Sequence, residues 1–166
     1  MKEERLEKEF LTLADTHQGI IHKVCRMYCD NETDRKDLFQ DILIQLWRAF
    51  PSFKGQSKFT TWAYRVAINT AISNYRKQKR RPRLDGLNGE ELQIPDYSNF
   101  SFEQEEQTQL LHRAINKLTK IEKAIIMLYL EEHSYEEIAA IIGITKTNVG
   151  VKINRIKIKL KSILKR

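Results

Sequence analysis

A helix-turn-helix pattern in the last third of the sequence constrains the fold of this chain more than any other feature. Ser134 is a suitable helix cap, and Glu137 follows at the spacing at which each side chain accepts a hydrogen bond from the other residue's backbone N–H. Gly143 comes after an apolar helical face and can adopt the backbone that a sharp turn between two helices requires. Thr145 or Thr147 can cap the next helix. The segment therefore predicts two helices joined by a tight turn.

The second of these helices has an apolar side and a basic, polar side. Its apolar stripe consists of Val149, Ile153, Ile156 and Leu160. Lys146, Asn148, Lys152, Arg155 and Lys159 lie largely off that stripe and carry groups that bind phosphates and base edges. Residues 138–166 hold eight Lys or Arg and no acid, a charge that suits binding to a polyanion. The charge therefore favours a nucleic-acid-binding helix-turn-helix over the alternative, a helical hairpin in an ordinary core.

Composition predicts helical domains that meet an acidic partner. The chain has 166 residues, 41% of them hydrophobic, with only six Gly and three Pro. A net charge of +7 and a pI near 9.4 favour nucleic acid over a membrane surface. No apolar run approaches the roughly 20 residues of a membrane span, and the polar, charged start is unlike a signal peptide. We expect a cytoplasmic protein without membrane insertion.

The first half of the chain reads as four helices. Apolar spacing predicts helices around residues 6–14, 20–29, 34–50 and 59–79, with Asn31 or Thr33 as the cap of the third and Pro51 at its end. Within the fourth helix, the residues expected to point inward are Trp62, Val66, Ala67, Ala71 and Tyr75.

The fourth helix and the residues around it have the composition of a single-strand binding surface. Residues 42–84 contain ten Lys or Arg and no acid, interleaved with aromatic side chains. Aromatic faces stack on exposed bases while basic groups follow the backbone. The alternative is that these aromatic residues fill the core.

Two small clusters invite a chemical interpretation. His22, Cys25 and Cys29 share one helical side and could ligate zinc or sense oxidants, although buried cysteines more often act as small hydrophobic residues. Asp34, Asp37 and Asp41 could be read as a nuclease metal cluster, but no further carboxylate or His follows until Asp85.

An acidic stretch divides the chain. Residues 85–109 hold seven acids, no Lys or Arg, two Gly and one Pro, without sustained periodicity. We therefore predict a first domain over residues 1–82, a flexible linker over 83–104 and a second domain over 105–166. The second domain should contain helices through residues 110–118 and 121–130 before the helix-turn-helix.

Three stretches in order, residues 37–47, 53–77 and 134–160, resemble the bacterial sigma-70 family of transcription initiation factors, in its short extracytoplasmic-function group. The resemblance covers nearly the whole chain. It implies an all-α protein with a region 2 helical bundle, a region 4 helix-turn-helix domain and a linker that threads the RNA-exit path of polymerase. Such a factor binds core RNA polymerase, directs it to promoters and helps to separate the strands. It catalyses nothing itself and needs no cofactor.

The resemblance assigns residues to three contacts. Polymerase binding would use Asp37, Gln40, Asp41, Gln45 and Trp47. Reading and melting of the minus-10 element would use Lys54, Lys58, Trp62, Tyr64, Arg65 and Asn69, with the loop 54–58 accepting an extruded base. Reading of the minus-35 duplex would use Lys146, Thr147, Asn148, Lys152 and Arg155.

Two departures from the family pattern stand in the second helix of the motif. Gly150 occupies a position where Lys or Ser is frequent, and glycine weakens a helix interior. Val151 and Ile158 form an added apolar strip, for which we expect a regulatory partner such as an anti-sigma factor. Two other functions stay open at this point, a stand-alone helix-turn-helix regulator that binds a palindrome as a dimer and a nucleic-acid enzyme.

Overall fold

The protein is helical wherever its structure is described. A computed structural model describes residues 1–80 and 102–165, and in these ranges every regular element is a helix. The chain divides into two compact units, which we describe separately. The first contains α1 (Lys2–Thr16), α2 (Gln18–Tyr28), α3 (Glu32–Ala49), the 3-10 turn η1 (Phe50–Ser52) and α4 (Phe59–Arg80). The second contains α5 (Phe102–Asn116), α6 (Lys120–Leu130), α7 (Tyr135–Ile142) and α8 (Lys146–Leu164).

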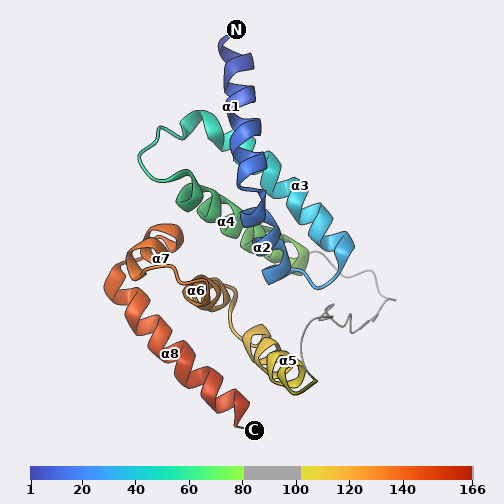
Figure 1. The fold of residues 1–166 in the computed structure, drawn as a ribbon, viewed down its shortest axis with the longest axis vertical. Coiled ribbons are helices and arrows are strands. Elements are labelled where there is room, and N and C mark those ends of the chain that lie inside the picture. Colours follow the sequence, from blue (N-terminus) through green and yellow to red (C-terminus); the bar gives the residue numbers. More distant parts are fainter. Residues whose placement is uncertain (81–101, 166) are drawn as a thin grey trace. The chain divides into compact units, whose positions relative to one another are not determined.

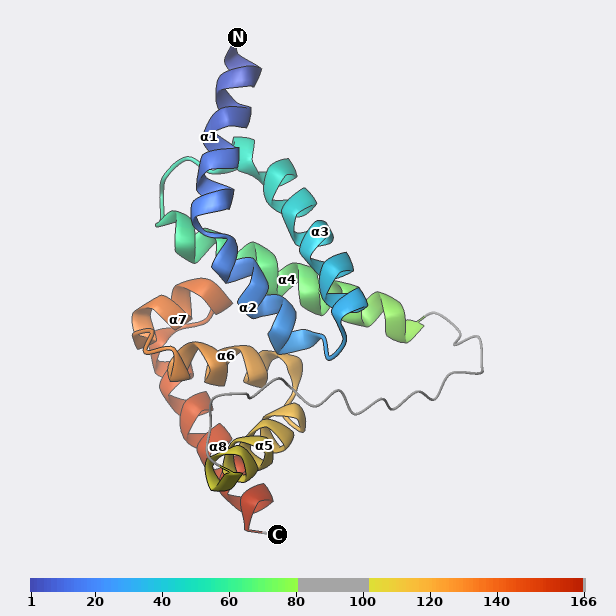
Figure 2. The ribbon, with the colours of Figure 1, turned by 45° about the vertical axis from the view of Figure 1, so that its right-hand side comes forward.

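The first unit is a bundle of α2, α3 and α4, and α1 packs against this bundle with its C-terminal turns. Val24, Ile42, Leu46 and Ala67 form its centre, each at most 1% exposed. Helix α1 buries Phe10 and Ala14 in its last two turns. Its first turns extend beyond the bundle (Figures 1 and 2). Within this bundle, one side of α3 and one side of α4 remain exposed to solvent.

An aromatic cluster closes the end of the bundle at which α3 turns toward α4. We use this name for Phe10, Trp47, Phe50, Phe53, Phe59 and Trp62. The ring centroids of Phe10 lie 5.1 Å from Trp47 and 5.2 Å from Phe50, and those of Phe53 and Trp62 are 4.9 Å apart. Tilted aromatic contacts at such distances stabilise beyond the area that they bury. The cluster thus fixes both ends of the connection between α3 and α4.

The second unit has its core where α8 crosses the other three helices. Ile125, Leu128, Ile138, Val149 and Ile153 have no exposed surface. Thr119 and Glu122 form a capping box at the start of α6. The turn between α7 and α8 depends on Gly143, whose φ of +84° lies in the left-handed region that suits glycine.

The sequence predictions hold for the elements of both units, and the all-α fold is confirmed. Asn31 caps α3 by accepting from the backbone N–H of Asp34, and α3 begins two residues earlier than predicted because of that cap. Most of the predicted linker, residues 83–101, lies outside the described residues, and α5 already begins at Phe102. None of the helices in residues 1–80 and 102–165 is long and apolar enough to cross a bilayer.

One predicted core position of α4 is wrong. Tyr75 was expected inside the bundle but is 42% exposed. Tyr75 lies in the last two turns of α4, beyond the buried Ile72. Ala67 and Ala71, which lie further back on the same helix, are buried as predicted.

Candidate nucleic-acid interface

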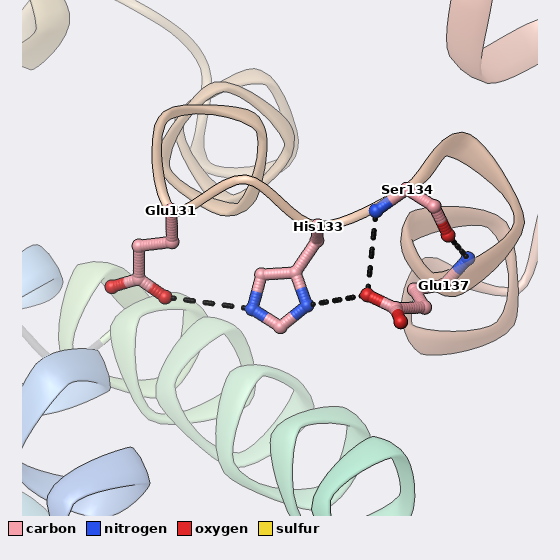
Figure 3. Close-up of polar contacts among 4 residues, drawn as sticks. All are labelled: Glu131, His133, Ser134 and Glu137. Carbon is pink, nitrogen blue, oxygen red and sulfur yellow. Dashed lines mark hydrogen bonds and ion pairs between the residues drawn. The ribbon is translucent and has the colours of Figure 1, made fainter.

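A set of hydrogen bonds holds the start of α7 in place. The Oγ of Ser134 accepts from the backbone N–H of Glu137 at 3.1 Å, and Oε2 of Glu137 accepts from the backbone N–H of Ser134 at 3.3 Å. The same Oε2 lies 3.0 Å from Nδ1 of His133, whose Nε2 faces Oε2 of Glu131 at 3.6 Å (Figure 3). This reciprocal cap orders the first helix of the motif and confirms the predicted Ser134–Glu137 pair.

The second helix of the motif, α8, presents the predicted polar side to solvent. Thr145 caps it by accepting from the backbone N–H of Asn148 at 3.1 Å. The apolar stripe of Val149, Ile153, Ile156 and Leu160 is buried, as predicted. Thr147, Asn148 and Arg155 are exposed and Lys152 is half-buried. The structure therefore brings these predicted minus-35 residues together on the side of α8 away from the core.

Lys146 begins α8 and contacts the preceding helix. Its Nζ lies 2.5 Å from Oε1 of Glu136, and both side chains are more than 60% exposed. The hydrogen bond from Lys146 holds the pKa of Glu136 below its ordinary value. An exposed pair of this kind is weak and screened by salt, so the lysine can exchange the carboxylate for a phosphate.

Two further lysines of α8 are engaged by α6, which the sequence did not reveal. Nζ of Lys157 donates to the hydroxyl of Tyr129 at 3.0 Å and lies 4.6 Å from the centre of that ring. Nζ of Lys159 donates to Oε2 of Glu122 at 3.0 Å. Partial burial raises the pKa of Glu122, but hydrogen bonds from Thr119 and Lys159 outweigh it, and the net pKa is lowered.

The connection between α3 and α4 contains a fully exposed loop. All five residues 54–58 are exposed, and Gly55 has a φ of +71°. Phe53 precedes the loop and Phe59 follows it, and their ring centroids lie 5.9 Å apart. The ring centroid of Trp62 lies 4.9 Å from that of Phe53 and 5.5 Å from that of Phe59. The aromatic cluster therefore fixes the loop at both ends, and the half-buried Trp62 contacts the rings on either side of it.

One side of α4 continues this loop as a polar stripe. Lys58, Arg65 and Asn69 are exposed and recur near helical spacing. Arg76 and Ser73 are exposed on the same side and were missed as site residues, although the same periodicity pointed to Arg76. Of the basic run at residues 76–83, the side chains from 78 onward lie outside the described part.

Tyr64 departs from the prediction for the minus-10 residues. It was expected to line or flank the melted strand, but it is 4% exposed because it lies on the side of α4 that faces the bundle. A buried ring offers no face for a base to stack on. Of the six residues predicted for this contact, the structure exposes Lys54, Lys58, Arg65 and Asn69 and half-buries Trp62.

The exposed side of α3 carries the residues predicted for polymerase binding. Asp37, Gln40, Asp41 and Gln45 are exposed, and Trp47 is 37% exposed while its other face contacts Phe10. Ile44, which is 47% exposed, belongs to the same face and was missed. Oδ2 of Asp41 accepts from Nδ2 of Asn74 at 2.7 Å, so that this carboxylate also ties α3 to α4.

The two clusters considered for metal chemistry do not form metal sites in the described residues. No group of three or more His, Cys, Asp or Glu within residues 1–80 and 102–165 is arranged to hold a metal ion. Cys25 is 2% exposed, and burial, with a smaller contribution from Cys29, raises its pKa to about 11. The ring of His22 lies against Phe39 with centroids 4.8 Å apart. The buried thiol packs as a hydrophobic side chain.

Comparison with known proteins decides the family. Residues 13–81 match Sigma-70 region 2, and residues 108–160 match Sigma-70, region 4. The chain is 32% identical over 160 residues to the ECF RNA polymerase sigma-E factor of Escherichia coli, and the match covers 90% of this chain and 83% of that protein. The chain belongs to the extracytoplasmic-function sigma factors.

Solved structures agree with this sigma factor in fold. The sigma factor RpoE of Bartonella quintana, in complex with the anti-sigma factor NepR, has a TM-score of 0.72 at 22% identity and covers 95% of this chain and 98% of that one. CnrH in complex with the cytosolic domain of CnrY has a TM-score of 0.66 at 21% identity, with 96% of this chain and 89% of that one covered. A sigma factor directs RNA polymerase to promoters, and the stand-alone regulator considered from the sequence is thereby disfavoured.

Proposed function

We propose that this sigma factor contacts core polymerase through the exposed side of α3, captures the melted minus-10 strand on the loop 54–58 and α4, and reads the minus-35 duplex with α8. The observation that carries this assignment is the exposure of three separate polar faces. Each contains most of the residues that family resemblance assigns to one contact. The proposal thus divides promoter recognition between the two units.

The face of α3 suits a protein partner better than a nucleic acid. Its predicted contacts are two carboxylates and two amides, and next to them lie the exposed Ile44 and Trp47. Carboxylates repel phosphate, whereas amides around a partly exposed tryptophan are typical of a protein interface, in which Trp often contributes strongly. This supports the proposal that polymerase binds to α3.

The loop 54–58 and α4 suit a single strand. Lys54 and Lys58 place positive charge on the loop, and Arg65 and Asn69 continue along the helix toward Arg76. Unpairing and extruding a base costs a few kcal/mol, so a loop whose ends are already fixed by aromatic packing favours strand opening by holding that base. Trp62 supports the loop and offers its exposed part for stacking.

Helix α8 suits the major groove of duplex DNA. The N-terminal residues of a recognition helix contact base edges, and Thr147 and Asn148 are exposed in the first turn. Arg155 and Lys152 follow on the later turns, from which they can reach a guanine edge or a phosphate. The cap at Thr145 and the turn at Gly143 hold this helix against α7.

Three further parts of the proposal follow from the family. The chain acts as an initiation factor without a catalytic step of its own, and it acts in the cytoplasm beside polymerase. We also infer an inhibitory partner, because the related RpoE structure contains an anti-sigma factor. The apolar strip of Val151 and Ile158, 42% and 69% exposed, is its candidate contact on α8. Unchanged inhibitor binding by the V151D/I158D double variant would refute that contact.

The proposal is tested by reconstitution with core polymerase. The chain alone should bind promoter duplex weakly, and the holoenzyme should form specific complexes with permanganate-reactive thymines near the start site. Asn69→Ala should weaken melting while upstream binding is kept, and Arg155→Ala should weaken upstream binding. Lys8→Ala, an exposed change on α1, is the control for both. Specific binding by the chain alone to a palindrome, or a holoenzyme that never melts DNA, would refute the proposal.

A further inference from the structure

An apolar side chain lies in the middle of the polar side of α8. Val151 is 42% exposed, although the buried stripe of the helix lies elsewhere. Residues three and four positions away on a helix are its surface neighbours, and these are Thr147, Asn148, Asn154 and Arg155. All four are exposed. Val151 is therefore surrounded by groups that donate or accept hydrogen bonds, and it takes no part in the core.

The position of Val151 along the helix places it where base edges are read. It is the sixth residue of α8, whose first turns enter the groove in the proposed placement. Ile158 lies on the same side but seven residues later, which is roughly 10 Å further along the axis. The major groove is about 12 Å wide. A helix that enters with its first turns brings Val151 among the base edges and leaves Ile158 toward the rim.

The chemistry of valine selects one base edge. Its side chain has no donor or acceptor, so that against a polar edge it would remove water without replacing the lost hydrogen bonds. In the major groove, the apolar group on an unmodified base is the 5-methyl group of thymine. Valine also has few rotamers, so its methyl groups hold a fixed position on the helix. A thymine methyl is the partner that this surface fits.

We propose that Val151 selects thymine at one position of the minus-35 element by contact with its 5-methyl group. This rests on the proposed placement of α8 in the major groove. Thr147, Asn148, Asn154 and Arg155 around it would contact neighbouring bases and phosphates. Val151 would thus determine promoter sequence in the holoenzyme and, together with Ile158, remain the proposed contact of an inhibitory partner when polymerase and DNA are not bound.

The test replaces thymine by uracil, which differs only in lacking the methyl group. An upstream element is first selected with the reconstituted holoenzyme from duplexes randomised in the minus-35 region. Each thymine of the selected element is then replaced singly by uracil. At one position, the affinity of the unaltered holoenzyme should fall roughly four-fold, the effect of removing one buried methyl or methylene group from an apolar contact. The Val151→Ala holoenzyme should bind thymine and uracil duplexes alike there.

Ile158→Ala is the matched control, because it shortens an exposed apolar residue on the same helix side. It should keep the full sensitivity to uracil. A selected element without thymine, or uracil sensitivity that Val151→Ala leaves unchanged, would overturn the inference while leaving the placement of α8 intact. A selection that enriches no upstream sequence would overturn both proposals.

Discussion

Two glycines of the helix-turn-helix should respond to the same substitution in opposite directions. Gly150 lies inside α8 with helical backbone, and a Cβ there would lie 3.6 Å from the ring of Tyr135, an ordinary van der Waals distance. Glycine in a helix interior is about 1 kcal/mol less favourable than alanine. Gly150→Ala should therefore stabilise α8 by about that amount.

At Gly143 there is space for a Cβ, but the backbone conformation is unfavourable for a residue that has one. No atom lies within 4 Å of the Cβ position, yet φ is +84°. A left-handed conformation destabilises the folded state by about 1 to 2 kcal/mol when the residue has a Cβ. Replacing glycine by alanine also lowers the conformational entropy of the unfolded chain, which stabilises the folded state by about 0.4 to 1 kcal/mol. Gly143→Ala should thus destabilise the motif by about 1 kcal/mol.

Hydrogen exchange is the suitable assay, because both tryptophans, Trp47 and Trp62, belong to the first unit. A change of 1 kcal/mol alters an opening equilibrium about five-fold. Amides of α8 should exchange about five-fold more slowly in Gly150→Ala and about five-fold faster in Gly143→Ala, and amides of α2 should not change in either. Equal responses of the two variants would refute the reasoning from backbone conformation, and faster exchange in Gly150→Ala would show that the Tyr135 contact does not accept a methyl group.

Three other predictions concern single contacts. Asn74→Ala removes the hydrogen bond to Asp41 and should lower the stability of the first unit by about 1 kcal/mol, read as a lower urea midpoint of tryptophan fluorescence; an unchanged midpoint would show that the pair contributes nothing. Glu122 has a lowered pKa in the folded protein, so its carboxylate stabilises the folded state. This stabilisation is complete above the ordinary carboxyl pKa and is lost as pH falls through the lowered pKa of the folded protein. The stability of α6 to exchange should therefore fall less between pH 6 and pH 3 in Glu122→Gln, with Lys159 kept in both proteins. The thiol of Cys25, with a pKa of about 11, should resist alkylation at pH 8 until the bundle unfolds, and rapid labelling of the native protein would contradict its burial.

Local signals explain how much of the fold the sequence predicted. Ser134, Glu137 and Gly143 act on their immediate neighbours, and such contacts can be recognised from spacing alone. Both Thr145 and Thr147 have side chains that can cap α8. The structure was needed to choose Thr145, because the backbone of the turn decides which residue directly precedes the helix.

The candidate site was harder to predict where it depends on partners distant in the sequence. Tyr64 has an aromatic ring that could stack on a base, but the packing of α4 against the bundle buries that ring in the core of the first unit. Asp41 was expected to face a protein partner, and its contact with Asn74, 33 positions away, is invisible to periodicity. Val151 was recognised as off the apolar stripe, yet its central place among polar neighbours became clear only with their exposure.

The lysines held by α6 and α7 have a consequence for how this factor responds to ionic strength. Helix α8 carries six basic residues, of which Lys146, Lys157 and Lys159 already contact Glu136, Tyr129 and Glu122. A lysine that keeps its contact with α6 neutralises no phosphate and so releases no condensed counterion. This applies to Lys157 and Lys159, whereas the exposed Lys146 can exchange its carboxylate for a phosphate. Each neutralised phosphate contributes about 0.9 to the slope of log affinity against log salt. If α8 reads the upstream duplex as proposed, binding should therefore depend on salt with a slope closer to that of four cations than of six, so that it varies less with ionic strength than the charge of the helix alone would predict.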